Sequence, residues 1–149
     1  IYGVPIYKQD NDWSCGHNSV RMVLDHFGNP PSITELYNYM GWSYTNAVDR
    51  ESALNHFGNL NVSLETYCTF GRLKDRVCEG TLAIVDLWLW NYAHSVVVTR
   101  IDKDEKVYYN DPWTGTLSSM SKNDFINKWN LNNYLSNPIA ENIVVFSRS

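Results

Sequence analysis

A change in hydrophobic periodicity near residue 58 constrains the fold more than any other feature of this sequence. Before residue 58, apolar residues recur at the spacing of three and four that is typical of amphipathic helices. After it, they form the alternating or continuous runs that are typical of strands. Helices followed by antiparallel strands predict an α+β fold. We therefore predict one domain, residues 1–149, in which a mainly helical lobe, 1–58, packs on a mainly antiparallel-sheet lobe, 59–149, with a cleft between them.

Local signals set the expected boundaries of the elements. Ser32 and Glu35 have the spacing of a capping box, and glycine or proline follows most of the helical patterns. The expected helices cover residues 15–27, 32–40, 49–57, 70–78 and 121–129. The expected strands cover residues 61–67, 81–89, 94–101, 106–110, 116–120 and 142–146, and a loop is expected at 127–137.

Cys15 stands at the opening of the first helical pattern and is directly followed by Gly16. The free N–H groups of a first helical turn and the positive end of the helix dipole favour a thiolate, so the position predicts a lowered thiol pKa. Gln9, six residues upstream, carries a side-chain amide that can reach the same place from the preceding loop. An unpaired cysteine is more often a small buried apolar residue, so Cys15 alone does not identify a nucleophile.

A thiolate nucleophile requires a base, and the base requires a group that orients it. His94 begins one expected strand, and Asp111 ends the next, with a charged turn at 102–105 between them. A hairpin would therefore bring His94 and Asp111 to the same open end. Since a slip of one residue would put them on opposite faces, this expectation depends on the register.

Together these residues resemble the papain-like cysteine peptidases. The matching pattern is glutamine, Cys-Gly at a helix start, histidine before an apolar strand, and Asp-Pro-x-x-Gly. Here it is met by Gln9, Cys15-Gly16, His94 to Val98 and Asp111 to Gly115. The most similar family is that of the bacteriocin-processing, double-glycine-leader peptidases and their stand-alone relatives. Ser14, His17 and Asn18 depart from the family pattern beside the cysteine, which bears on substrate more than on fold.

The resemblance implies a papain-like fold and a role for each residue. Cys15 would attack a carbonyl as thiolate, His94 would transfer the proton, and Asp111 would orient His94. Gln9 and the Cys15 backbone N–H would stabilise the oxyanion of a thioester-forming reaction.

Several neighbouring residues have two interpretations. Trp13 and Trp113 either flank the cleft or pack between lobes, and residues 88–92 are expected to line a substrate groove. His17 is expected to face solvent or the cleft rim, because it follows the cysteine by two helical positions. Asp86, inside an apolar strand, is interpreted as a structural carboxylate.

Composition restricts the function only weakly. The net charge of −4 gives no basic footprint, so nucleic acid is not an expected partner. The three cysteines lack metal-site spacing, no metal or cofactor is predicted, and Cys68 and Cys78 are expected to be unpaired. No apolar run is long enough to span a membrane.

Two principal functions remain open from the sequence. The first is a thiol-dependent hydrolase acting on a peptide or protein, with deamidation and transglutamination as variants of the same chemistry. The alternative is a secreted bacterial toxin or effector domain acting on another target, such as nucleic acid, with an inhibitor or immunity protein as partner. An inactive peptide-binding module is a third. Because the first residue is Ile, we expect a domain excised from a larger protein, either cytoplasmic or delivered and secreted.

Overall fold

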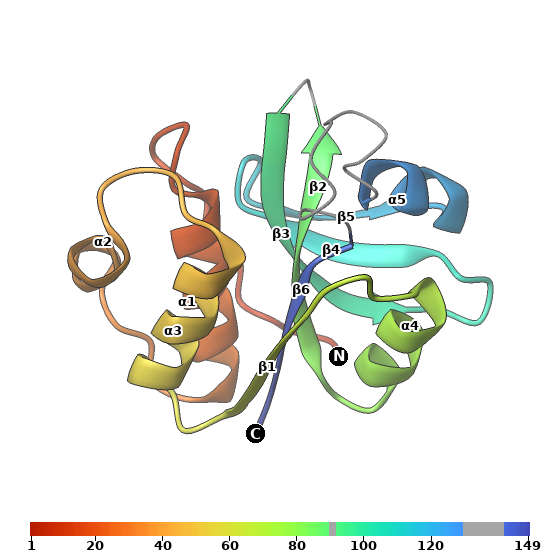
Figure 1. Cartoon of the computed structure of the whole chain (residues 1–149), viewed down its shortest axis with the longest axis horizontal. Helices are drawn as coiled ribbons and strands as arrows, with labels where there is room; N and C mark the ends of the chain where they lie inside the picture. The colour runs from red at the N-terminus through yellow and green to blue at the C-terminus, as the bar shows by residue number, and fades with distance from the viewer. Residues whose placement is uncertain (90–91, 130–141) are drawn as a thin grey trace.

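The computed structural model describes residues 1–89, 92–129 and 142–149, and these residues form helices and one antiparallel sheet (Figure 1). The helices are α1 (Cys15–Phe27), α2 (Ile33–Met40), α3 (Ala47–Phe57), α4 (Phe70–Cys78) and α5 (Lys122–Trp129). The strands are β1 (Asn61–Glu65), β2 (Leu82–Leu89), β3 (Tyr92–Ile101), β4 (Val107–Asp111), β5 (Thr116–Met120) and β6 (Val144–Arg148). The predicted α+β class is confirmed.

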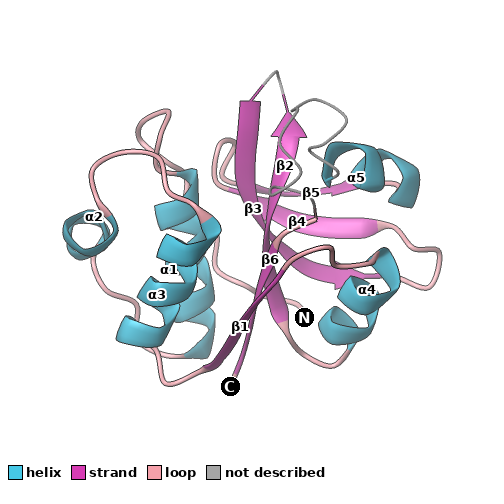
Figure 2. Ribbon diagram, viewed as in Figure 1, coloured by secondary structure: helices cyan, strands magenta, loops and turns pink. Residues whose placement is uncertain are grey.

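The strands lie in the order β1-β6-β2-β3-β4-β5, and each neighbouring pair is antiparallel. Helices α1, α2 and α3 lie on one side of the sheet, and α4 and α5 lie on the other (Figure 2). The central strands β2 and β3 are therefore covered on both faces, which explains why their sequences are continuous apolar runs.

Two apolar cores follow from the alternation of side chains along these strands. Ile84 and Val97 pack with α1, α2 and α3, whereas Val85 and Val96 pack with α4 and α5. All four residues are buried. Adjacent residues of a strand thus contribute to different cores, as the period of two requires.

The helix starts are determined by capping. Ser32 and Glu35 form the predicted capping box at α2. α3 begins at Ala47, two residues before the predicted start, because Asn46 and Asp49 form a second capping box.

Strand boundaries differ from the predictions by one or two residues in most cases, and β6 begins at Val144 rather than at residue 142. Tyr67 and Asn142 have positive φ values of 53° and 47°, which end the extended conformation at these places. The part of the predicted loop beyond residue 129 lies outside the described residues, and the predicted lobe boundary at residue 58 stays a prediction. None of the described helices is long and apolar enough to span a membrane.

Candidate active site

Cys15 is the first residue of α1, as predicted, and its side chain is almost buried. Gly16 explains the close packing around it. A Cβ atom at residue 16 would overlap Thr45 Oγ1 and would lie 3.3 Å from Cδ of Arg50. Glycine therefore allows the segment before α3 to approach the start of α1, which brings that segment beside the thiol.

His94 and Asp111 meet at the open end of the β3–β4 hairpin. His94 Nε2 lies 2.5 Å from Asp111 Oδ1, and both side chains are buried. The same carboxylate oxygen accepts the backbone N–H of Trp113 at 2.9 Å, which fixes its orientation.

A bulge in β3 sets the register that brings this pair together. Near the turn Arg100 lies opposite Tyr108, but beyond the irregularity Val97 lies opposite Asn110. If this register continues, Asp111 lies opposite Val96. Val96 and His94 are two residues apart on β3, so their side chains point to the same face of the sheet, and the side chain of Asp111 points to that face as well. Without the extra residue, Asp111 would oppose Val97 and face away from His94.

The thiol of Cys15 contacts the His94 side chain. Burial by itself raises the pKa of the thiol, but hydrogen bonds to the His94 side chain and the Ser95 backbone outweigh it, so that the pKa is lowered. Burial by itself lowers the pKa of His94, but the hydrogen bonds to Asp111 and Cys15 raise it to about 9. Both shifts favour the state in which a thiolate lies next to an imidazolium.

Cys68 and Cys78 provide a comparison. Both are free, as expected. Cys68 is buried, and desolvation together with the charge of Glu65 raises its pKa to about 11. The lowered pKa of Cys15 therefore reflects its own surroundings and is not common to the buried thiols.

Gln9 is anchored to the turn that follows Asp111. Its backbone N–H donates to Pro112 O at 2.8 Å, and its Nε2 donates to Asn11 O at 2.6 Å. Gly115 has a φ of +68°, and a Cβ there would lie 2.9 Å from Cβ of Lys8, which explains the glycine of the Asp-Pro-x-x-Gly motif. Within the described part of the chain, the Gln9 amide donates to Asn11 rather than to Cys15, and its Oε1 has no hydrogen-bond partner.

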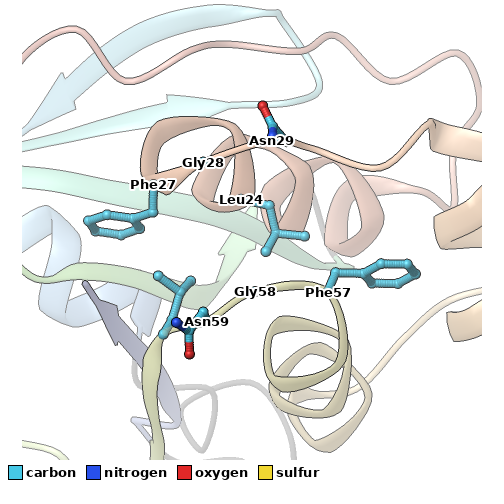
Figure 3. Close-up of a pocket in the computed structure, with 8 residues that line it drawn as sticks. Leu24, Phe27, Gly28, Asn29, Phe57, Gly58 and Asn59 are labelled. Carbon is cyan, nitrogen blue, oxygen red and sulfur yellow. The ribbon is translucent and has the colours of Figure 1, made fainter.

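Two depressions adjoin these residues. One, of about 330 Å³, is lined by residues that include Cys15, Tyr44, Asp86 and Tyr92. Tyr92 belongs to the 88–92 segment, whose place in a substrate groove stays a prediction. The other, of about 380 Å³, contains Gln9 and the partly exposed Trp113. A third depression, of about 280 Å³, lies between the ends of α1 and α3 (Figure 3), and none of the predicted site residues lines it.

Asp86 belongs to a polar network that the sequence did not reveal. Arg50 Nη2 of α3 lies 2.5 Å from Asp86 Oδ2, and Ser95 Oγ donates to Asp86 Oδ1 at 2.6 Å. The carboxylate is thus structural, as interpreted, but it also lines the depression beside Cys15. An aspartate inside an apolar strand was the available signal; its partner in a separate helix was not predictable.

The expectation for His17 is wrong. His17 is fully buried, packs edge-on against Trp13 and Tyr37, and its Nε2 lies 2.7 Å from Gly41 O. Since a carbonyl only accepts, Nε2 carries the proton. Trp13 accordingly packs within the helical layer, where it also contacts Trp42.

The α+β fold brings together a cysteine, a histidine and an aspartate, which are the residue types of thiol-dependent acyl-transfer enzymes. Residues 1–137 match the Peptidase_C39 like family. The chain therefore belongs to this family and is a cysteine-peptidase-like hydrolase.

Solved structures agree on the fold. A C39-like peptidase from Bacillus anthracis superposes with a TM-score of 0.80 at 14% identity, covering 99% of this chain and 95% of the other. A double glycine motif protease from an AMS/PCAT transporter, in complex with its leader peptide, gives 0.74 at 21% identity, with 99% and 93% covered. The peptidase domain of Streptococcus ComA, a bifunctional ABC transporter of a quorum-sensing pathway, gives 0.74 at 17% identity, with 97% and 98% covered. No match is found among curated proteins, and the family and these structures do not favour the toxin hypothesis.

Proposed function

We propose that this protein hydrolyses a peptide bond through a thioester with Cys15. The thiolate attacks the carbonyl carbon, and His94 as imidazolium then protonates the leaving amine. Water, deprotonated by the same imidazole, then attacks the thioester carbonyl, which releases the carboxylic acid and regenerates the thiolate next to the imidazolium. Asp111 holds His94 in the tautomer and orientation that this sequence of transfers requires.

The single observation that carries the proposal is the continuous contact from Cys15 through His94 to Asp111. It is supported by the opposite directions of the two pKa shifts, since the thiol pKa is lowered while that of His94 is raised. A buried structural cysteine has no reason to sit beside a histidine that is itself paired with a carboxylate.

We propose Gln9 and the backbone N–H of Cys15 as the oxyanion donors. Nε2 of Gln9 has two hydrogens, and the hydrogen bond to Asn11 O uses one. That bond fixes the amide plane, and the second N–H remains for a substrate oxygen that approaches Cys15. The neighbour solved with a leader peptide supports a peptide as substrate here too.

Selective alkylation tests the proposed nucleophile. Iodoacetamide at pH 5.5 should label Cys15 at least about a hundredfold faster than an ordinary thiol, whose thiolate fraction there is on the order of 0.001. Cys78 is exposed, so Cys78→Ser removes the background labelling. Labelling is measured by mass spectrometry of the tryptic peptides.

Peptide cleavage completes the test. Cys15→Ala should abolish cleavage of a synthetic peptide library, whereas Cys68→Ala should retain it. Equal and slow labelling of Cys15 and Cys68, or cleavage that survives in Cys15→Ala, would exclude this mechanism.

A further inference from the structure

The depression beside Cys15 has the dimensions of a side-chain pocket. Its volume is about 330 Å³. Tyr44 and Tyr92 line it and are 65% and 38% exposed, so both rings are accessible to a ligand. A pocket of this size beside the nucleophile has room for a full side chain of a bound peptide.

Asp86 is the carboxylate of this pocket. Its side chain is 17% exposed, so it lies deeper than either tyrosine and still faces the open space. Among the described residues that line the pocket, it is the only acidic or basic one apart from the thiol. An apolar occupant would remove this carboxylate from water without replacing the lost hydrogen bonds.

The carboxylate of Asp86 still has acceptor capacity. Among the described residues, Oδ1 accepts a hydrogen bond from Ser95 and Oδ2 accepts one from Arg50. An ionised carboxylate offers about four lone-pair sites, so two contacts leave room for a donor from the pocket. The two existing bonds also hold the carboxylate still, which lowers the entropic cost of recognition.

The charge balance decides which donor is suited. Arg50 is 2% exposed and approaches from α3, so it neutralises Asp86 from behind without entering the open space. Arg50 Nη1 in turn donates to Thr45, whose oxygens are acceptors as well. The pocket therefore presents acceptors with little net charge, which favours a neutral donor such as an amide and disfavours a carboxylate.

We propose that this pocket binds a side chain that donates hydrogen bonds, with glutamine as the best match, and that Asp86 determines this specificity. The proposal rests on the proposed function, because it assigns a subsite of that peptidase. It also means that glycine is not the preferred residue at the position that faces the pocket.

Irreversible peptide probes test the specificity without a known substrate. The set is acetyl-Ala-X-Gly and acetyl-Ala-Gly-X vinyl sulfones, with X as Gln, Glu, Met or Gly. In the reaction the sulfur of Cys15 adds to the β-carbon of the vinyl group, and the α-carbon takes the proton of His94. Gln, Glu and Met are close in size, so their rates differ by hydrogen bonding and charge.

The expected result is a second-order inactivation rate that is about tenfold higher for Gln than for Glu, Met or Gly at one of the two positions. In Asp86→Asn the ratio of Gln to Glu should fall to about one, because the new amide offers a donor to the Glu probe. Asp86→Asn removes the negative partner of the buried Arg50 and can therefore destabilise the fold. Tyr44→Ala, which keeps this ion pair, serves as a second variant. It should reduce the preference for Gln over Gly about threefold, and Tyr2→Ala, at an exposed tyrosine outside this pocket, should leave it unchanged.

The order of the probes by inactivation rate of the wild-type protein is enough to overturn the inference. A Gly-Gly or Met probe that reacts fastest, or an unchanged Gln-to-Glu ratio in folded Asp86→Asn, excludes the proposed specificity while leaving the peptidase intact. Failure of iodoacetamide to label Cys15 selectively would instead exclude the proposed function.

Discussion

Cys15 and the His94–Asp111 pair come from different elements, a helix and a β-hairpin, and depend on different kinds of structure. Cys15 is positioned by one helix, whose apolar stripe packs on the sheet and whose second residue, Gly16, permits close approach. The pair is positioned by the relation between two strands, including an extra residue in β3. The position of Cys15, on the helix side, therefore depends on local structure. The position of the His94–Asp111 pair, on the sheet side, depends on a strand register that a single residue can shift. The sheet side should therefore be the more sensitive to small changes.

Asp111→Asn tests the sheet side and should have a larger effect than any change at the loop or in pH. The amide preserves the shape but permits the wrong imidazole tautomer and removes the charge, so kcat/KM should fall about a thousandfold. Steady-state cleavage of a peptide found with the library measures it. Asp104→Asn, at an exposed turn, is the matched control and should stay within about twofold of wild type. Near-normal activity of Asp111→Asn would mean that His94 needs no orienting carboxylate.

Gln9→Met tests the loop that connects the two sides. Loss of one oxyanion donor should lower kcat about a hundredfold with little change in KM, because the bond strengthens only in the transition state. Lys8→Met puts the same side chain at the neighbouring position and should change kcat by less than about threefold. An effect of Gln9→Met on KM alone would assign Gln9 to ground-state binding.

A change of pH should have the smallest effect on kcat/KM, and this effect depends on the ionisation of both Cys15 and His94. The pKa of the Cys15 thiol is lowered and that of His94 is raised to about 9, so both shifts widen the pH range in which the thiolate–imidazolium pair exists. kcat/KM should fall about tenfold per pH unit above pH 9, as the imidazolium of His94 loses its proton. In Asp111→Asn this alkaline limb should move to lower pH, because a hydrogen bond that raises the pKa of His94 is weakened. An alkaline limb that stays at pH 9 in this variant would contradict the assignment to His94.

Much of the fold and part of the site were predictable from the sequence. Capping residues and apolar stripes act over three or four positions, so the helix at Cys15 and the capping box at Ser32 were predicted correctly. His17 was placed wrongly, because its aromatic neighbours Trp13 and Tyr37 come from the loop before α1 and from α2, and its hydrogen-bond partner, the Gly41 carbonyl, follows α2.

The amino-acid sequence by itself determined which side chains are present and which local elements carry them: a thiol at a helix start, an imidazole at a strand start and a carboxylate before a proline. Only the tertiary structure decided how they meet. The bulge in β3 puts Asp111 on the face of His94, and the pair of Arg50 and Asp86 joins residues 36 positions apart. The physical reason is that register and ion pairing between distant segments depend on packing of the whole sheet and its helices, which no local pattern encodes.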